Sequence, residues 1–477
     1  MHKPADPVRP TASTPTELVA GEFVIRSPHD GSEVGRVRAA TRGDVDEAVR
    51  AARHALATDP LETWRRVEIL EAAAGEIGRR AEEFAERISR EAAKPITAAR
   101  TEVQRGIATF AAAATAARTI TGEAVPVDAV PQGSGRLAFT VRVPIGVVGA
   151  ITPFNFPLNL VAHKIAPALA AGCPVVLKPA EQTPLTALAL RDVLVESCGL
   201  PPAYLSVLPG TGAEVGARLA EHPGVDYVSF TGSVPAGRAI QRAAWSKKVA
   251  LELGNNSPVI VTADADWERA ARDVVAGAFG YSGQTCVSVQ RVLVHSSIAG
   301  EFADLVAQET AKLAVGSPDD AATVVSALVS ASAADRVERW VDEAAAAGAR
   351  VLTERRRVGA TVWPVVLSEV PADQPVWADE VFGPVVALRE YTTVDEAIAE
   401  ANDTRFGLQA SIYTQDLPTA LNALRRLDFG GVLVNEVPSW RVDLMPYGGV
   451  RDSGNTKEGP AYAARDMTEE RLLVVRP

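Results

Sequence analysis

The turn that ends at Cys286 is the first place where this chain could carry chemistry. Gly283 lets the backbone bend, so that the thiol of Cys286 can be presented in a cleft. The other two cysteines stand at the start of an apolar run (Cys173) and at the end of a predicted helix (Cys198), which indicates packing roles. Cys286 is therefore the best candidate for a nucleophile, although the turn alone also fits a structural cysteine.

A second reactive group is the carboxylic acid of Glu252, which lies inside the apolar run 249–253. Acidic residues are rarely buried without a reason. Burial penalises the charged form and so raises the pKa of a carboxyl group. A carboxyl group with a raised pKa is suited to act as a general base.

A third group is the amide of Asn155, which is framed by Pro153 and Pro157. The two prolines fix the backbone around this side chain, and Pro157 suits the first turn of a following helix. An amide held in this way is a fixed N–H donor for an oxyanion. A rigid turn in which the asparagine bonds the backbone is the alternative interpretation.

Three loops after predicted strands carry groups that suit a nucleotide. Lys178 and Glu181 are placed to meet ribose hydroxyls, with a surface ion pair as the alternative. The loop 230–233 opens a helix with a Gly-Ser pair, which offers free N–H groups and a hydroxyl to a phosphate. The Gly-Thr-Gly turn that ends at Gly212 is a comparable junction, but a lone turn of this kind is weak support.

Buried strands that alternate with helices must position these groups. From residue 145 onward, short apolar runs are separated by amphipathic stretches, which is typical of a parallel sheet with right-handed crossovers. Five such strands make a doubly wound, nucleotide-binding type of domain. The predicted strands are 145–151, 174–178, 205–208, 225–230 and 249–253, and the predicted helices are about 157–171, 184–198, 213–221 and 233–245.

Helices precede this sheet, and a second α/β region follows it. Residues 44–110 have helical apolar spacing, with Thr41 or Asp44 as cap and Pro95 as an interruption, so at least three helices are expected. The segment 331–361 is interpreted only as a helix followed by an irregular stretch. Further predicted elements are a helix at 267–282 and strands at 136–142, 258–261, 289–295, 384–390, 410–413, 431–434 and 471–476. The last strand has no neighbour in sequence, so it should pair with a distant segment or another subunit.

Composition excludes several classes of protein. Of 477 residues, 47% are hydrophobic and 22% are charged, which excludes a disordered chain or a coiled-coil rod. The net charge of −11 comes without a basic block, so no nucleic-acid partner is expected. No histidine or cysteine pair has metal-ligand spacing, so no metal is expected. Three cysteines are too few for a disulfide framework and indicate reduced thiols in the cytoplasm.

Neither a leader nor a membrane span is expected. Residues 1–15 are polar and proline-rich, and we interpret them as a flexible lead-in rather than an export signal. Residues 143–162 lack charge but contain three prolines and two asparagines, whose polar groups would be costly in lipid. A buried strand that leads into a buried loop is the better interpretation of this run.

Together these residues resemble the NAD(P)-dependent aldehyde dehydrogenase superfamily, and the resemblance spans essentially the whole chain. Seven motifs occur in the right order, which makes coincidence negligible although each alone is modest. The motifs are Pro153-Phe154-Asn155-Phe156-Pro157, Lys178-Pro179-Ala180-Glu181, Phe230-Thr231-Gly232-Ser233, Leu251-Glu252-Leu253-Gly254, Gly283-Gln284-Thr285-Cys286, Glu380-Val381-Phe382-Gly383-Pro384 and Pro446-Tyr447-Gly448-Gly449.

The resemblance implies a catalytic role for three residues. Cys286 would attack the aldehyde carbonyl, and Asn155 with the backbone N–H of Cys286 would hold the oxyanion. After hydride transfer, Glu252 would activate the water that hydrolyses the thioester. The product is then a carboxylic acid.

The resemblance also implies NAD as cofactor, with NADP as the alternative. Lys178 and Glu181 would meet the adenosine ribose and Ser233 the pyrophosphate, while Glu380 and Phe382 would meet the nicotinamide ribose and ring. The other residues expected beside the cofactor are Thr152, Pro153, Phe154, Ala180, Gly212, Phe230, Thr231, Gly232 and Leu253.

The fold that the resemblance implies is α/β, with a Rossmann-type cofactor domain, an α/β catalytic domain and a small β oligomerisation element. The expected boundaries are 1–121 and 142–254 for NAD(P) binding, 255–455 for catalysis, and 122–141 and 456–477 for oligomerisation. A homodimer or homotetramer is expected.

The sequence departs from the family pattern in a few places. Phe154 stands where tryptophan is frequent, and Asn255 stands where a second glycine is usual. Because asparagine tolerates left-handed backbone better than most residues, the turn at Asn255 is expected to survive. Residues 455–459 lack a common glycine and have lysine where arginine is frequent.

Three functions compete. A hydrolytic aldehyde dehydrogenase is the leading hypothesis. A relative that passes the thioester to coenzyme A is the second, but such relatives commonly lack the glutamate base that Glu252 supplies here. A non-catalytic structural member is the third, and the presence of both Cys286 and Glu252 argues against it.

The expected substrate contacts are Arg105, Phe156, Thr285 and Arg441. Relatives that oxidise phosphorylated or phosphono-aldehydes resemble this chain in having arginines near 105 and 441. They often carry a third arginine just before the nucleophile, where this chain has Thr285. The pattern favours a small aldehyde, including an anionic phospho-, phosphono- or carboxy-aldehyde, with salt bridges as the alternative role of both arginines.

Overall fold

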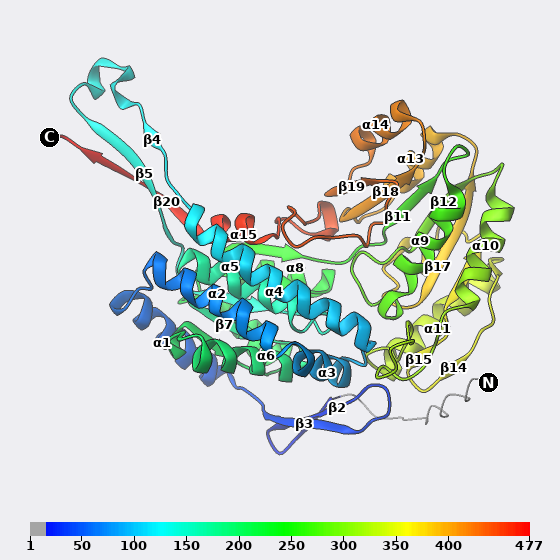
Figure 1. Ribbon diagram of the computed structural model, residues 1–477, viewed down its shortest axis with the longest axis horizontal. Helices are drawn as coiled ribbons and strands as arrows, with labels where there is room; N and C mark the ends of the chain where they lie inside the picture. Colours follow the sequence, from blue (N-terminus) through cyan, green and yellow to red (C-terminus); the bar gives the residue numbers. More distant parts are fainter. Residues whose placement is uncertain (1–15) are drawn as a thin grey trace.

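The computed structural model describes residues 16–477, so the proposed lead-in of residues 1–15 lies outside the described residues. Four consecutive helices precede the first parallel sheet in the chain (Figure 1). Thr41 caps the first of them through a reciprocal capping box with Asp44, and Pro95 separates the third from the fourth, as predicted. These helices are α1 (Arg42–Thr58), α2 (Thr63–Arg79), α3 (Ala81–Ala92) and α4 (Ile96–Thr119), which runs past the predicted end at 110.

The predicted doubly wound sheet is present, with all five strands parallel and in the order β10-β9-β6-β7-β8. Its strands are apolar throughout because helices cover both faces. One core contains α2 to α6, and the opposite core contains α1, α7 and α8. The strands are β6 (Val148–Ile151), β7 (Val175–Lys178), β8 (Leu205–Val207), β9 (Tyr227–Thr231) and β10 (Lys248–Glu252).

The connecting helices are close to their predicted positions, but two are shorter. They are α5 (Asn159–Ala171), α6 (Pro184–Asp192), α7 (Ala217–Glu221) and α8 (Val234–Ala243). Wider π-type turns at Val193–Ser197 and Gly212–Gly216 take up the rest of the predicted helices 184–198 and 213–221. The uncharged run 143–162 is the strand β6, a buried loop and the start of α5, as expected. Within residues 16–477, no helix is long and apolar enough to cross a membrane.

The second α/β region is a seven-stranded sheet in the order β13-β16-β17-β12-β11-β18-β19. Only β13 is antiparallel to its neighbour. The strands are β11 (Pro258–Val261), β12 (Arg291–His295), β13 (Arg350–Val351), β16 (Val365–Ser368), β17 (Val385–Tyr391), β18 (Gln409–Tyr413) and β19 (Gly431–Val434). The helices around it are α9 (Trp267–Phe279), α10 (Ala299–Ala311), α11 (Ala331–Ala346), α12 (Pro375–Ala378), α13 (Val394–Asn402) and α14 (Leu417–Arg426).

Several short elements were not predicted. A three-stranded antiparallel sheet opens the described chain, and its strands are β1 (Thr16–Val19), β2 (Glu22–Arg26) and β3 (Glu33–Arg38). The irregular part of 331–361 contains β13 and a small hairpin of β14 (Arg357–Val358) and β15 (Thr361–Val362). β13, β14 and β15 have only two residues each, too few for an alternating pattern to stand out in sequence.

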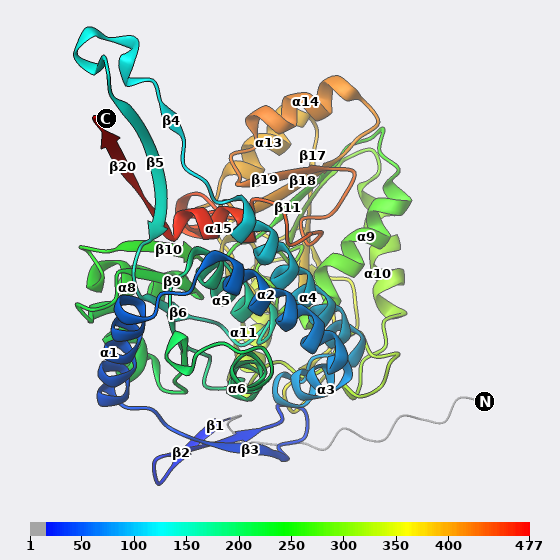
Figure 2. The same ribbon diagram turned by 60° about the vertical axis from the view of Figure 1, so that its left-hand side comes forward.

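An extended arm projects from the body of the molecule, with the C-terminus near its end (Figures 1 and 2). It is built from β4 (Ala124–Val125), β5 (Leu137–Pro144) and β20 (Thr468–Val475), and the last helix, α15 (Pro460–Asp466), leads into it. β20 pairs along the whole of β5, which confirms that the terminal strand finds a distant partner. The domain boundaries given above remain a prediction.

Candidate active site

A cleft runs along the carboxyl ends of β6, β7, β9 and β10, where ligands bind in doubly wound sheets. It consists of two adjoining cavities of about 330 and 530 Å³ that share Pro153, Phe154, Thr231 and Gly232 in their walls. Cys286 and Asn155 line the smaller cavity. Every residue predicted to meet the cofactor lines one or both cavities, and the ones not yet named are Thr152, Lys178, Ala180, Glu181, Gly212, Phe230, Ser233, Leu253, Glu380 and Phe382.

The turn before Cys286 is bent through three consecutive residues in left-handed backbone. Tyr281, Ser282 and Gly283 have φ of 50°, 58° and 70°. A Cβ at Gly283 would lie 2.2 Å from the carbonyl oxygen of Gly383, so only glycine fits there. The Ser282 hydroxyl donates to the Ser326 carbonyl at 2.9 Å and so stabilises the bend. This strained turn presents the thiol to the cleft, as nucleophile-bearing turns often do.

The Cys286 thiol is partly exposed and lies 2.8 Å from the hydroxyl of Tyr447. Desolvation raises the pKa of Cys286 to about 11, while the Tyr447 hydroxyl and the Arg441 cation act in the opposite direction. Tyr447 and Arg441 therefore favour the thiolate of Cys286, whereas desolvation, Glu380 and Glu252 favour the thiol.

The Asn155 side chain is buried, and its Nδ2 donates to the Gln284 carbonyl at 2.8 Å, which brings it beside the Cys286 turn. Its loop is anchored by two buried residues that the sequence did not single out. Lys94 donates from Nζ to the Asn155 carbonyl at 2.7 Å and pairs with Glu102. Glu102 in turn accepts from the backbone N–H groups of Leu158 and Asn159 at 2.8 and 3.1 Å, and so fixes the start of α5.

Glu252 ends β10, and its expected burial is confirmed, with only 3% of the residue exposed. Neither carboxylate oxygen has a hydrogen-bond partner among residues 16–477. Desolvation, followed by the nearby Glu458, raises the pKa of Glu252 well above its usual range. A carboxyl group left unpaired in this way is available to a water molecule at the reacting centre.

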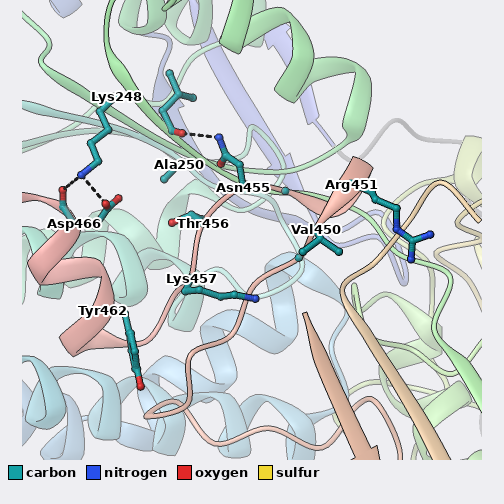
Figure 3. A pocket seen from close by; sticks show the side chains of 12 residues that line it. Lys248, Ala250, Val450, Arg451, Asn455, Thr456, Lys457, Tyr462 and Asp466 are labelled. Atoms are coloured by element: carbon teal, nitrogen blue, oxygen red, sulfur yellow. Dashed lines mark hydrogen bonds and ion pairs between the residues drawn. The ribbon is translucent and has the colours of Figure 1, made fainter. Parts of the chain in front are cut away.

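Asn455 fixes the edge of β10, because its side-chain amide makes hydrogen bonds to the β10 backbone of the kind that a neighbouring strand would make (Figure 3). Its Oδ1 accepts from the Leu251 N–H at 2.8 Å, and its Nδ2 donates to the Val249 carbonyl at 3.0 Å. A cavity of about 700 Å³ lies along this edge, and in its wall Lys248 pairs with Asp466 at 2.6 Å. The Asn455 hydrogen bonds fix the β10 backbone just before Glu252.

Asn255 does not adopt the left-handed backbone that was considered for it. Its side chain is buried, and its Nδ2 donates to the Ser257 hydroxyl at 2.8 Å and to the Gln409 carbonyl at 3.2 Å. The asparagine therefore holds the turn through side-chain hydrogen bonds rather than through an unusual φ.

The far end of the cleft fits the adenosine half of a dinucleotide. Glu181 lies 3.3 Å from Lys178 Nζ, and its Oε1 accepts from the Gly212 N–H at 2.9 Å, so the three predicted residues come together. Ser233 precedes α8 and makes no side-chain capping bond. The first turn of α8 therefore keeps its N–H groups free for an anion.

The near end of the cleft fits a flat ring and a ribose. Glu380 accepts from the Asn255 N–H at 3.1 Å, and burial raises the pKa of Glu380 to about 7. The rings of Phe382 and Phe154 meet edge to face with centroids 5.8 Å apart. The cleft therefore offers an acidic acceptor and an aromatic surface within the cavity that holds Cys286.

The four predicted substrate residues line neither cavity. The two arginines among them, Arg105 and Arg441, also have surroundings that differ from the expectation. Arg441, an expected substrate contact, has a side chain that is only 7% exposed, whereas the neighbouring Trp440 is 47% exposed. Asp443 bonds Arg105 through two contacts of 2.8 and 3.0 Å, and lies 3.9 Å from Arg441. The Asp443 carboxylate therefore neutralises Arg105 rather than Arg441.

Arg441 lies at the centre of a buried polar cluster next to the nucleophile. Its guanidinium stacks 3.7 Å from the ring centroid of Tyr447 and lies 3.3 Å from His163 and 3.4 Å from Glu458. Its Nε has no hydrogen-bond partner in the described part of the chain. Phe156 is near by, with its ring 5.5 Å from the Arg105 guanidinium. Thr285 precedes Cys286 and is half-buried.

Sequence reasoning missed His163, Lys164 and Glu458. One signal was available, because His163 and Lys164 interrupt a helix that is otherwise almost entirely apolar and fully buried. His163 lies 2.8 Å from Asp443, and Lys164 lies 3.4 Å from Glu458. No group of three side chains suited to hold a metal ion occurs between residues 16 and 477.

Comparison with known proteins identifies relatives along nearly the whole chain. The model of the aldehyde dehydrogenase family matches residues 17–473. The 3-sulfolactaldehyde dehydrogenase of Priestia aryabhattai is 45% identical, with 96% of each chain covered. The lactaldehyde dehydrogenase of Methanococcus aeolicus is 35% identical, with 96% of this chain and 99% of the relative covered. The structure of glyceraldehyde-3-phosphate dehydrogenase from Methanocaldococcus jannaschii complexed with NADP superposes with a TM-score of 0.91 at 36% identity, over 95% of this chain and 98% of that one.

Proposed function

Because the chain belongs to the aldehyde dehydrogenase family, whose members oxidise aldehydes to acids with NAD(P)⁺, we propose that Cys286, Asn155 and Glu252 carry that reaction here. The observation that supports this most is that the Cys286 thiol and the Asn155 amide line one cavity, while the unpaired carboxyl group of Glu252 lies close enough to influence the pKa of Cys286. Absorbance of the reduced cofactor, followed with a panel of aldehydes with and without coenzyme A, tests it. Turnover that requires coenzyme A would favour the acylating alternative.

In the first half of the proposed reaction the sulfur of Cys286 bonds to the aldehyde carbon. The C=O electron pair moves onto oxygen, where Asn155 Nδ2 and the backbone N–H of Cys286 stabilise the charge. NAD(P)⁺, when bound in this cleft, would supply the acceptor for the hydride that leaves this carbon. The carbonyl re-forms, and the acyl group is left on Cys286 as a thioester.

In the second half Glu252 takes a proton from a water molecule that attacks the thioester. The C–S bond breaks, the carboxylic acid forms, and the electron pair returns to sulfur. The unpaired, buried carboxyl group of Glu252 suits this task because its raised pKa makes it a stronger base once it is ionised.

The cofactor would be held by Lys178 and Glu181 at the adenosine ribose, by Ser233 at the pyrophosphate, and by Glu380 and Phe382 at the nicotinamide end. Lys178 and Glu181 line the larger cavity, and Ser233, Glu380 and Phe382 line the smaller one with Cys286. Free N–H groups at the start of α8 favour the pyrophosphate.

We expect a modest preference for NAD over NADP. The Glu181 carboxylate would repel a 2′-phosphate, and Lys178 offsets this only in part because it already pairs with Glu181 at 3.3 Å. Comparing kcat/KM for the two cofactors at equal salt concentration checks the preference, and Glu181→Gln should narrow it. A preference for NADP of about tenfold or more would contradict the role given to Glu181.

The proposed substrate is a three-carbon 2-hydroxyaldehyde with an anionic group on its third carbon. Lactaldehyde, 3-sulfolactaldehyde and glyceraldehyde 3-phosphate, the compounds after which the three relatives are named, share this 2-hydroxypropanal skeleton. Two of the three add an anion at carbon 3. In this chain the unpartnered Nε of Arg441, close to Cys286, provides a cation for such a group.

Arg441→Ala should raise KM for 3-sulfolactaldehyde by roughly 10- to 100-fold, as expected for a lost charge-assisted hydrogen bond of about 1.5–3 kcal/mol. Lactaldehyde differs only by the missing sulfonate, so it is the matched neutral substrate. Arg105→Ala should have a smaller effect, since Asp443 already neutralises Arg105. Equal changes for both aldehydes would show that the arginines only shape the fold.

The arm formed by β4, β5 and β20 is proposed to join subunits into a homodimer or homotetramer. Apolar side chains on it are open to solvent, with Leu137 64%, Leu472 56% and Val474 52% exposed. A second copy would cover this surface, and sedimentation velocity determines the number of copies. The three free cysteines fit a reducing compartment such as the cytoplasm.

A further inference from the structure

The hydroxyl of Tyr447 lies 2.8 Å from the sulfur of Cys286, and the function proposed above gives it no task. Tyr447 is 3% exposed, and its backbone is fixed because its carbonyl accepts from the Glu458 N–H at 2.5 Å. The next residue, Gly448, allows close packing, since a Cβ there would lie 2.7 Å from Glu252 Oε1. The phenol is thus buried and fixed beside the nucleophile, and it is close enough to Glu252 for that carboxylate to raise the pKa of Tyr447.

The surroundings of Tyr447 determine which partner gives the proton. Desolvation, followed by the neighbouring Cys286, raises the pKa of Tyr447 well above its usual range, so the phenol keeps its proton. The Arg441 guanidinium, 3.7 Å from the ring centroid, favours a more polarised O–H. A phenol of this kind donates to a thiolate in a charge-assisted hydrogen bond, which is about twice as strong as a neutral one.

We propose that Tyr447 is a further catalytic residue whose hydroxyl donates a hydrogen bond to the sulfur of Cys286 and stabilises its thiolate. The thiol proton passes to solvent when the thiolate forms, and Tyr447 keeps its own proton. The bond then acts twice in the reaction proposed above, on which this part of the inference rests. It lowers the cost of forming the attacking thiolate, and it stabilises the thiolate that leaves when the thioester is hydrolysed.

Alkylation of Cys286 by iodoacetamide across a range of pH tests this without any substrate or cofactor. Tyr447→Phe removes only the hydroxyl, so the apparent pKa of the thiol should rise and the alkylation rate near neutral pH should fall by about 10- to 100-fold. Because the assay contains no aldehyde, its result tests the role of Tyr447 independently of which aldehyde the protein oxidises.

Two controls isolate the hydrogen bond. Cys286→Ala gives the background from the buried Cys173 and Cys198. Tyr391→Phe removes another buried phenol hydroxyl, which donates to the Val261 carbonyl at 3.1 Å beside the seven-stranded sheet. This variant should leave the alkylation profile of Cys286 unchanged. It also shows how much stability such a deletion costs on its own.

Insertion of 3-fluorotyrosine at position 447 gives an independent result if Tyr447→Phe folds poorly. The fluorinated phenol is more acidic and a stronger donor, so the thiol pKa should shift downward, opposite to the shift in Tyr447→Phe. Unchanged alkylation in both variants would overturn the proposal. Faster alkylation in Tyr447→Phe would overturn it as well, because the hydroxyl would then hold the thiol back as an acceptor.

Discussion

Cys286→Ala is expected to abolish oxidation of every aldehyde while cofactor affinity stays within a few-fold of wild type. The reason is that no other described cysteine reaches the cleft, since Cys173 and Cys198 are buried in the core that contains α2 to α6. Without the sulfur no thiohemiacetal can form, so the aldehyde carbon cannot release its hydride. Steady-state absorbance of the reduced cofactor measures the loss, and fluorescence titration measures cofactor binding.

Cys198→Ala is the matched control for this variant. It removes a thiol of the same kind from a packed position and should keep nearly all activity. Residual turnover of Cys286→Ala above about one percent of wild type would contradict the assignment of the nucleophile, because loss of a covalent nucleophile costs far more than this.

Glu252→Gln is expected to stall the enzyme after hydride transfer. A pre-steady-state burst of reduced cofactor should remain, while the steady rate falls by roughly 10²–10⁴, the usual contribution of a general base. Glutamine keeps the shape of the side chain but cannot take a proton from water. Stopped-flow absorbance separates the burst from the steady phase.

The pH dependence gives the same experiment a second readout. Because the pKa of Glu252 is raised, its basic form becomes more populated as pH increases, so the steady rate of the wild type should increase with pH. Glu252→Gln should lose this dependence on the hydrolytic step. Loss of the burst itself in Glu252→Gln would assign Glu252 to an earlier step.

Glu91→Gln is a control for the removal of a buried charge. Glu91 is fully buried, and it accepts from the N–H groups of Leu185 and Thr186 at the start of α6, away from the cleft. The variant should lose stability because the helix cap is weakened. The ratio of burst to steady rate should stay as in wild type.

Much of the fold could be predicted from the sequence because apolar runs and helical spacing are local signals. The carboxyl ends of β6, β7, β9 and β10 fall within about one residue of their predicted positions, so the sequence places the loops that follow them at the right edge of the sheet. That edge brings together Asn155, Glu181 and Ser233, which are far apart in sequence.

The detail around the nucleophile could not be predicted in this way. Tyr281 and Ser282 have positive φ although neither is glycine, and this strain is imposed by tertiary contacts such as the hydrogen bond to Ser326. Likewise, no pattern shows that Asp443 bonds Arg105 in preference to Arg441, although Arg441 is only two positions away from it in sequence. Both arrangements depend on how distant segments pack.

The most direct measurement is mass spectrometry of Glu252→Gln quenched in acid after one turnover with 3-sulfolactaldehyde and NAD⁺. A thioester is the central intermediate of the account, and this variant should accumulate it. We expect an acyl adduct on the peptide that contains Cys286, at a level that matches the burst of reduced cofactor. Reduced cofactor without any adduct, or an adduct on another residue, would contradict covalent catalysis by Cys286.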